Sequence, residues 1–212
     1  MVQTAPSMRL EASGPNADER RREILAAASG LFRAKGLHAT GMRDIAAALG
    51  RTAGNLYYYF PSKQHLLAYC QEATLDELLR RAADIERSGG TADDRLRRLI
   101  AAHVEVLNES TPGSLAHLEI DEVPPARRGA LLARRKRYER IFRKRIEEGV
   151  AEGVFRPVDP ALAALALLGA LNWTVKWFEA EGRKSAAEVG REFAALLVDG
   201  LALGARPRKE KG

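Results

Sequence analysis

Residues 40–63 of this 212-residue chain read TGMRDIAAALGRTAGNLYYYFPSK, and their spacing constrains the fold more than any other stretch. Ala46 precedes Gly50 by four residues, and Leu56 follows that glycine by six. A small residue lets two helices approach, a glycine makes the turn between them, and an apolar residue buries the second helix against the first. The spacing predicts a helix-turn-helix, although any small helical hairpin can show the same pattern.

Polar residues at the expected helix starts divide this stretch into three helices. Thr40, Thr52 and Ser62 are the expected N-caps, because a hydroxyl can accept from the free N–H groups of a first turn. Phe60-Pro61 ends the second helix, since proline disfavours a helical conformation in the residue before it. The outward face of the second helix is then free to enter a DNA major groove.

The residues expected to contact DNA lie on and beside that face. Arg43 and residues 52–55 are predicted nearest the base edges, whereas Tyr58 and Lys63 are predicted to contact phosphate. Lys63 begins a helix whose free N–H groups also favour an anion. The full predicted DNA-binding set is Thr40, Arg43, Thr52, Ala53, Gly54, Asn55, Tyr57, Tyr58, Tyr59 and Lys63.

The stretch GMRDIAAALGRTAGNLYYYFPSKQHLL resembles the N-terminal domain of the TetR family of bacterial transcriptional repressors. The matching positions are Thr40, Ile45-Ala46, Gly50, the run Leu56-Tyr57-Tyr58-Tyr59-Phe60 and Lys63. The close resemblance covers roughly residues 23–67, and beyond them it is one of helix layout. It implies a homodimer formed through the last two long helices, and a ligand pocket in the second domain whose occupancy changes the spacing of the two DNA-binding heads.

Composition narrows the remaining classes. With 46% hydrophobic and 29% charged residues, the chain can build one or two globular domains, and its net charge of +6 is compatible with nucleic-acid binding. The single Cys70 excludes an internal disulfide and predicts a buried, inert thiol. Because no run of 18 apolar residues and no signal core are present, we expect a cytoplasmic protein that has no membrane partner.

Helix signals along the whole chain predict an all-α fold. Caps and breaks place helices at about residues 16–35, 62–87, 91–111, 125–152, 160–180 and 185–203, with a shorter one at 114–122. The first of these begins at a capping box formed by Asn16 and Glu19. The predicted domains are a flexible arm at 1–17, a three-helix helix-turn-helix domain at 18–63, a helical-bundle ligand-binding and dimerisation domain at 64–205, and a basic tail at 206–212.

The helix at residues 160–180 is apolar on nearly every face, which a chain of this size cannot cover alone. Paired with residues 185–203, it predicts a four-helix bundle with a second copy of the chain. Two heads on a two-fold axis would read a palindromic operator in double-stranded DNA. The alternative is that the apolar helix forms the central core of a monomer.

The second domain is expected to bind a small-molecule effector between the helices at 91–110, 125–152 and 160–180. Asn172-Trp173, Trp177-Phe178 and Gly182-Arg183 resemble a subset of TetR regulators that respond to acyl-coenzyme A thioesters. The dense cations of 125–152 could meet a phosphorylated or carboxylated ligand, or simply form a solvated face. The predicted ligand-binding residues are His103, Leu107, Phe142, Asn172, Trp173 and Trp177, with His117 as a further candidate.

Other functions have less support in the sequence. The chain has no Ser-His-Asp layout, Gly-rich phosphate loop, HExxH motif or Cys-His cluster, so we expect no catalytic residues, no metal site and no cofactor. The remaining alternatives are a repressor that responds to an uncharged or cationic hydrophobic compound, and a helical interaction protein that does not bind DNA.

Overall fold

The computed structural model describes residues 15–110 and 117–202, and in that part the chain is α-helical with one isolated bridge between Phe155 and Ala202. A π-helical turn (Val106–Ser110) and a 3-10 turn (Ile120–Glu122) interrupt the α-helices. The α-helices are α1 (Pro15–Lys35), α2 (Met42–Ala48), α3 (Ala53–Tyr59), α4 (Lys63–Ser88), α5 (Ala92–Glu105), α6 (Pro125–Ala151), α7 (Pro160–Trp177) and α8 (Ala186–Asp199).

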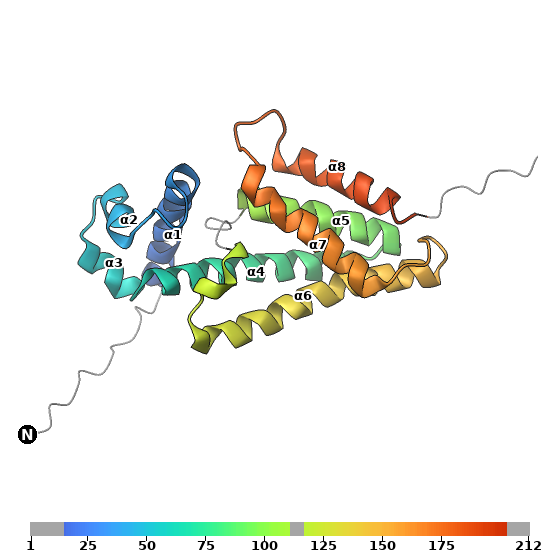
Figure 1. Ribbon diagram of the computed structural model, residues 1–212, viewed down its shortest axis with the longest axis horizontal. Helices are drawn as coiled ribbons and strands as arrows, with labels where there is room; N and C mark the ends of the chain where they lie inside the picture. Colours follow the sequence, from blue (N-terminus) through green and yellow to red (C-terminus); the bar gives the residue numbers. More distant parts are fainter. Residues whose placement is uncertain (1–14, 111–116, 203–212) are drawn as a thin grey trace, which may run out of the picture.

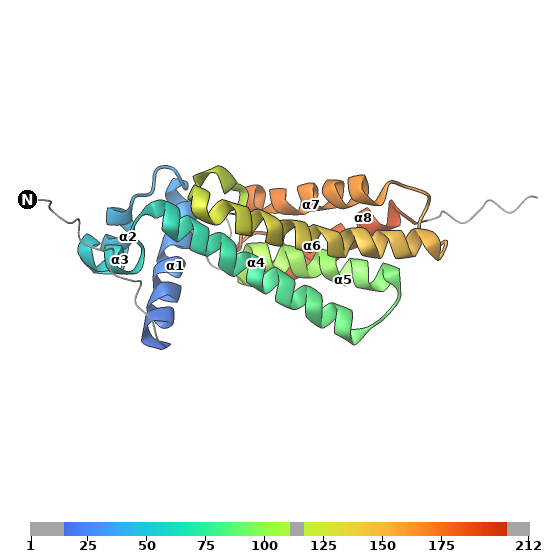
Figure 2. The same ribbon diagram turned by 90° about the horizontal axis from the view of Figure 1, so that it is seen from below.

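Helices α1–α3 form a small head at one end of the molecule, and α5–α8 form a bundle at the other (Figure 1). The long helix α4 starts in the head and continues along the bundle, as the rotated view in Figure 2 shows. Within the bundle α5 packs against α8, and α6 packs against α7. The fold is therefore the predicted all-α arrangement of a helix-turn-helix domain and a helical domain.

Helix α4 contributes side chains to two separate hydrophobic cores. Leu66, Leu67 and Cys70 belong to the core of the head, whereas Leu75 and Leu78 belong to the core of the bundle. Burial raises the pKa of the Cys70 thiol to about 12, so this thiol is the inert core residue that the sequence predicts. Because one rigid helix carries both cores, no flexible linker separates the head from the bundle.

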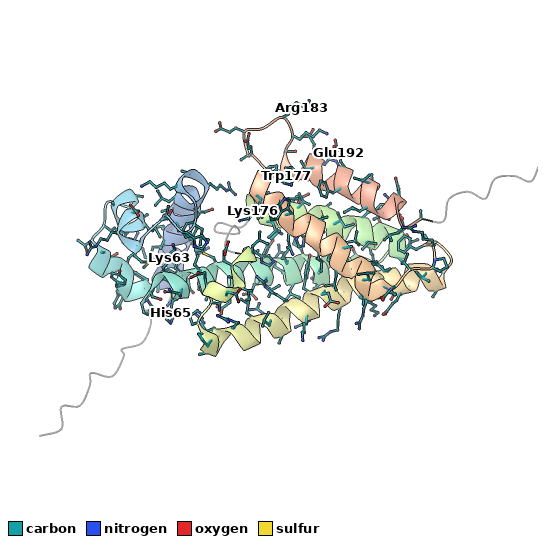
Figure 3. All side chains as sticks on the ribbon, viewed as in Figure 1. Lys63, His65, Lys176, Trp177, Arg183 and Glu192 are labelled. Atoms are coloured by element: carbon teal, nitrogen blue, oxygen red, sulfur yellow. The ribbon has the colours of Figure 1, made fainter. Side chains whose placement is uncertain are left out.

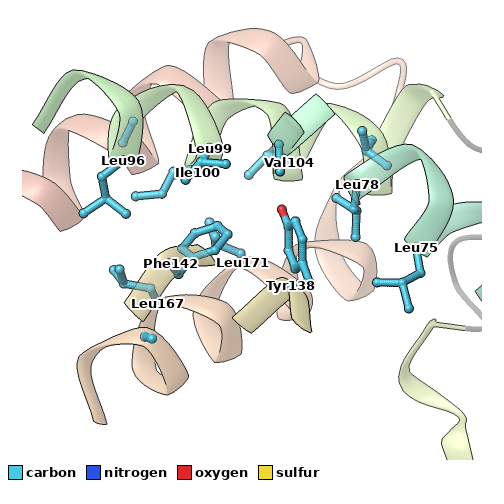
Figure 4. Close-up of a cluster of buried hydrophobic side chains, with 14 of the residues drawn as sticks. Leu75, Leu78, Leu96, Leu99, Ile100, Val104, Tyr138, Phe142, Leu167 and Leu171 are labelled. Carbon is cyan, nitrogen blue, oxygen red and sulfur yellow. The ribbon is translucent and has the colours of Figure 1, made fainter. Parts of the chain in front are cut away.

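The bundle core is built from apolar side chains that α5, α6 and α7 direct toward one another. Figure 4 shows Tyr138 and Phe142 of α6 facing Ile100 and Val104 of α5. The packing between α5 and α8 is so close that a Cβ atom at Gly190 would lie 2.9 Å from the carbonyl oxygen of Ala101. Glycine at this position therefore permits the contact between the two helices.

Most predicted caps are confirmed by hydrogen bonds to first-turn N–H groups. Thr52 accepts from Asn55 N and Ser62 from His65 N, while Thr91, Asp159 and Ser185 cap α5, α7 and α8. These polar side chains predict helix starts well because each bond forms within four residues of the cap.

Other predicted helix bounds are wrong. Helix α1 already begins at Pro15, which suits a first helical position, so the predicted start at Asn16 is one residue late. Helix α7 ends at Trp177 and α8 at Asp199, three and four residues early. Of the helix expected at 114–122, the described residues hold only 3-10 turns, at 117–118 and at Ile120–Glu122. Residues 111–116 lie outside the described part, as do most of the predicted arm and the tail.

None of the helices in the described residues is long and apolar enough to cross a membrane.

Candidate functional site

Helices α2 and α3 form the predicted helix-turn-helix. Ala46 and Leu56 are both buried, and Gly50 between them adopts a φ of 62°, a left-handed conformation that favours glycine. The N–H of Arg51 donates to the Ala46 carbonyl (2.9 Å) and that of Gly50 to the Ala47 carbonyl (3.0 Å). These two bonds form a Schellman motif, which ends α2 and sets the direction of α3.

The outward face of α3 carries most of the predicted DNA-binding residues. Tyr57 and Tyr58 are 48% and 61% exposed, and Tyr59 is half-buried with its ring edge-on to that of Tyr58, at 5.2 Å between centroids. Exposed apolar rings that the protein core does not use are available to a partner. Arg43, Thr52, Gly54 and Asn55 are also exposed, whereas Ala53 is half-buried.

Thr40 lies elsewhere, and its predicted roles as N-cap and DNA contact are wrong for the side chain. The residue is only 1% exposed, and its hydroxyl donates to the carbonyl oxygen of Gly36 at 2.8 Å. Gly41 is the N-cap of α2, and its N–H is bonded to the Asp44 carboxylate at 2.8 Å. That hydrogen bond, together with Lys35, lowers the pKa of the Asp44 carboxyl.

Lys63 stands where the head meets α4 (Figure 3). Its ammonium donates to the carbonyl oxygens of Leu37 at 2.6 Å and His38 at 3.4 Å, in the loop after α1. An ammonium has three N–H donors, so one remains for a further acceptor. Lys63 thus fixes the loop between α1 and α2 in addition to its predicted role at phosphate.

A cavity of about 450 Å³ lies between α4, α5, α6 and α7. Its mouth is between α6 and α7, where Leu132, Lys136 and Gly169 are exposed. Apolar and polar side chains share its wall, as is typical of small-molecule sites. The lining residues are Leu75, His103, His117, Leu132, Arg135, Lys136, Tyr138, Glu139, Leu165, Leu168, Gly169 and Asn172.

His103 connects three helices in the wall of this cavity. Its Nε2 lies 3.2 Å from Oδ1 of Asn172, and its Nδ1 lies 3.2 Å from the hydroxyl of Tyr138. Burial lowers the pKa of His103 to about 4, so the ring is neutral at pH 7. Because Asn172 presents its carbonyl oxygen, Nε2 carries the hydrogen and Nδ1 accepts from Tyr138.

Arg135 and His117 supply the remaining polar wall. Arg135 donates through Nη2 to Oε1 of Gln71 at 2.9 Å and to the carbonyl of His117. Burial lowers the pKa of Arg135, and burial together with the Arg135 charge lowers that of His117 well below its usual value. Both Nε of Arg135 and Nδ1 of His117 are buried without a hydrogen-bond partner. Two side chains of the cavity wall therefore each hold a buried polar atom whose hydrogen-bonding capacity is not used.

The structure brings together only some of the six predicted ligand-binding residues. His103 and Asn172 line the cavity, and Phe142 lies behind them with its ring edge-on to that of His103. Leu107 is buried but is not part of the cavity wall.

Trp173 and Trp177, which are also predicted ligand-binding residues, do not line this cavity. These residues are 60% and 46% exposed, because the face of α7 that they occupy points away from the bundle core. Trp177 instead stacks on Phe193 of α8, with 5.9 Å between the ring centroids, at the turn between α7 and α8 (Figure 3). The hydrophobic periodicity of the sequence does not indicate which face of α7 is exposed, because this helix is apolar on nearly every face.

The cations of α6 are mostly ion-paired. Arg127 lies 3.1 Å from Glu72, and Arg145, which is 2% exposed, lies 3.2 Å from Glu86. For most of these cations, the structure therefore agrees with the interpretation of α6 as an amphipathic helix with a charged outer face. Sequence reasoning did not select Arg135 or Tyr138 for the site, because which side of α6 faces the cavity depends on its packing against α5 and α7.

The head exposes α3, the second helix of the helix-turn-helix. The continuous helix α4 joins this head to a bundle that contains a cavity. This arrangement is that of a helix-turn-helix transcriptional regulator. A family model described as the tetracyclin repressor-like C-terminal domain matches residues 89–201, and one described as bacterial regulatory proteins of the tetR family matches residues 24–70. The first match covers more than half of the chain. The chain therefore belongs to the TetR family.

Similar proteins agree with this assignment. The HTH-type transcriptional repressor KstR2 of Mycobacterium tuberculosis is 27% identical over 187 residues, which cover 87% of this chain and 94% of KstR2. The solved structure of KstR2, described as a ketosteroid transcriptional regulator, has a TM-score of 0.78 over 92% of this chain and 100% of that chain. The protein is thus a TetR-family transcriptional regulator and not an enzyme.

Two further solved structures show the same fold. The TetR family regulator PfmR from Thermus thermophilus is 35% identical, with a TM-score of 0.76 over 85% of this chain and 99% of that chain. AibR in complex with isovaleryl coenzyme A and operator DNA is 25% identical, with a TM-score of 0.72 over 84% of this chain and 98% of that chain.

Proposed function

We propose that this regulator is a homodimeric repressor that binds a palindromic operator and is released from it by an acyl-coenzyme A thioester. The observation that carries the proposal is the cavity between α4, α5, α6 and α7, whose wall combines leucines with polar side chains and whose mouth carries the exposed Lys136. The relationship to AibR, whose structure holds isovaleryl coenzyme A together with operator DNA, favours this class of effector.

DNA binding is assigned to the exposed face of the head. Thr52, Gly54 and Asn55 at the start of α3 would lie nearest the base edges, with Arg43 of α2 beside them. The exposed rings of Tyr57 and Tyr58, with Tyr59 beside them, would flank the backbone. Lys63 would use its remaining N–H donor for a phosphate, and Ala53 would contribute surface without a polar group.

A second copy of the chain would cover an apolar stripe on α7 and α8. Leu162, Leu165 and Trp173 are 66%, 58% and 60% exposed, and their spacing of three and eight residues places them on one side of α7. Gly169 lies between them on the same side, and Leu196 of α8 is 72% exposed. Apolar side chains that are this exposed and this closely grouped are typical of a protein interface.

The cavity suits an apolar acyl chain better than it suits a cation. Leu75, Leu132 and Leu168 would bury the chain, and each CH₂ group would add about 0.8 kcal/mol of affinity. Lys136 is exposed at the mouth, and the exposed Arg140 lies one helical turn further along α6. These two cations would meet the phosphates of coenzyme A.

A thermal-shift screen of acyl-coenzyme A species, free acids and cationic dyes tests this proposal, followed by operator-release assays with each hit. We expect the thioesters to stabilise the protein increasingly with acyl length until the cavity is full. Release requires that the effector binds the DNA-incompetent arrangement more tightly, since equal affinity for both arrangements shifts nothing. Stabilisation by cationic dyes alone would reject the thioester and favour a regulator that responds to cationic hydrophobic compounds.

A further inference from the structure

Arg135 differs from the other buried or half-buried arginines of α6 because no carboxylate in the described residues neutralises its charge. Arg127, Arg134 and Arg145 each lie within 4.0 Å of a carboxylate, on Glu72, Asp76 and Glu86 respectively, and Arg128 and Arg143 also have carboxylate partners. Arg135 has only an amide oxygen and a peptide carbonyl, and the described residues place no carboxylate within that distance. Among the buried or half-buried arginines of α6, Arg135 is thus the one without a carboxylate partner in the described residues, and its side chain lines the cavity.

Leaving a guanidinium buried without a counter-charge costs free energy, and a bound anion would remove that cost. The Nε–H of Arg135 is buried and has no acceptor, which is also true of Arg128 and Arg145 in the same helix, so the missing carboxylate is what distinguishes Arg135. Next to it, His117 is 6% exposed and its Nδ1 has no partner, so a second buried polar atom in the same wall is unused. Arg135 and His117 both line the cavity, so a carboxylate that reached this wall would lie beside both side chains.

Lys136 at the mouth and Arg135 in the wall occupy different parts of the cavity. Lys136 is exposed, whereas Arg135 is partly buried and is held inward by Gln71 of α4. The phosphates of coenzyme A would be met outside, so they cannot also neutralise Arg135 within the wall. The thioester group itself is uncharged and does not neutralise it either.

We propose that the effector carries a carboxylate at the end of its acyl chain remote from coenzyme A, and that Arg135 and His117 bind this group. This inference rests on the proposed function, since it names the acyl group that the same cavity would take. The effector is then an ω-carboxyacyl thioester, that is, a dicarboxylic acid esterified at one end only. Apolar side chains such as Leu75 and Leu168 would bury the methylene groups between its two ends.

The test compares adipoyl-coenzyme A with hexanoyl-coenzyme A, which share a six-carbon chain and differ in a terminal carboxylate or methyl group. Isothermal titration of the full chain should show about tenfold tighter binding of adipoyl-coenzyme A, because a carboxylate–guanidinium pair in a desolvated site is a strong contact. In Arg135→Gln the affinity for adipoyl-coenzyme A should fall to that of the hexanoyl thioester. Arg135→Lys keeps the charge and should retain part of the preference, which separates loss of the charge from a loss of folding.

Arg134→Gln is the matched control, because this neighbouring arginine pairs with Asp76 and does not line the cavity. It should keep the full preference for adipoyl-coenzyme A. Equal binding of the two thioesters by the unmodified protein, or a preference that persists in Arg135→Gln, would overturn the inference and leave the proposed function in place.

Free adipate and free hexanoate complete the experiment. Binding of adipate that depends on Arg135, with neither thioester bound, would support the carboxylate site and reject the coenzyme A part of the proposed function. If none of the four probes binds, both the inference and the thioester proposal are overturned.

Discussion

Asn172 of α7 accepts a hydrogen bond from His103 of α5 across the wall of the cavity, with 3.2 Å between Oδ1 and Nε2. Two residues further along α7, the hydroxyl of Thr174 accepts from the side-chain amide of Asn108, at 2.9 Å. The backbone carbonyl of Asn108 in turn accepts from Arg33 of α1, at 3.0 Å. Helix α7 is therefore connected both to the cavity and, through a π-helical turn, to the DNA-binding head.

Replacing Arg33 by Met should weaken the coupling between effector and operator. The substitution removes the guanidinium bonded to Asn108 and keeps an apolar side chain of similar length. We expect the effector to bind with unchanged affinity. The factor by which it lowers operator affinity should be roughly fivefold smaller than in the unmodified protein, which corresponds to the lower end of typical coupling energies. Fluorescence anisotropy of labelled operator, titrated with and without effector, measures this ratio.

The control for Arg33→Met is Arg80→Met, at an exposed arginine of α4 that pairs with Glu77 within its own helix. Its response to the effector should match that of the unmodified protein. An unchanged response in Arg33→Met as well would show that the bond to Asn108 carries no coupling.

Acidification should destabilise the fold through His103. Its folded pKa of about 4 lies below the unfolded value of 6.5, so between these two pH values the unfolded chain binds more protons. The free energy of unfolding should be fully retained above pH 6.5 and should fall by up to about 3 kcal/mol as the pH drops toward 4. His117, whose pKa is also lowered, adds to the same trend.

Urea unfolding at pH 7.5, 6 and 5 measures this dependence. His103→Gln cannot titrate at this position, so its stability should fall less steeply over the same range, with His117 supplying what remains. A pH dependence identical to that of the unmodified protein would contradict a buried, neutral His103.

Replacing Thr40 by Val should reduce stability without altering operator recognition. The buried hydroxyl donates to the Gly36 carbonyl, and its loss leaves that acceptor unpaired, at a cost of about 1–2 kcal/mol. Thr52→Val is the matched comparison, because Thr52 is exposed and caps α3. Thr52→Val should lower the free energy of unfolding by about 1 kcal/mol, because the cap is lost, and should also weaken operator binding.

Chemical unfolding and operator titration on the same samples separate the two threonines. If Thr40→Val changed the preferred operator sequence while stability stayed constant, the buried structural role of Thr40 would be refuted.

A charge in the apolar stripe should separate the proposed dimer. Leu196→Glu and Leu162→Glu place a carboxylate at positions that are 72% and 66% exposed in the single chain, so the monomer should still fold. Sedimentation should then show one 23.3 kDa species, and operator affinity should fall by at least about tenfold because only one head binds. Val154→Glu, at an exposed apolar residue of the loop after α6, should remain dimeric.

The sequence predicts the head better than the bundle, for a physical reason. Caps such as Thr52 and Ser62, and the turn at Gly50, act over a few residues, so their signals survive without tertiary information. Thr40 is an exception within the head. Its hydroxyl satisfies the end of α1 instead of the start of α2, and only the packed structure distinguishes the two.

The cavity depends on how helices face one another, which local signals do not specify. His103 and Asn172 of the predicted ligand-binding set line the cavity, yet Trp173, one residue after Asn172, is exposed. Arg135 could not be distinguished by sequence from its ion-paired neighbours in α6, since the carboxylates that pair with them come from α4 and from the turn before α6. The face of each helix that meets the cavity is decided by tertiary packing.

In the proposed function, an effector in this cavity controls operator binding. The most direct measurement is the anisotropy of a palindromic operator, selected from a random duplex library, as thioester is added to the bound protein. We predict that operator affinity falls at least about tenfold, and that Leu132→Trp, which narrows the mouth, keeps operator binding but no longer responds to the thioester. Leu132→Met, of similar volume to leucine, should respond normally. An operator affinity that is unchanged at saturating effector, or an equal response in Leu132→Trp, would contradict the account.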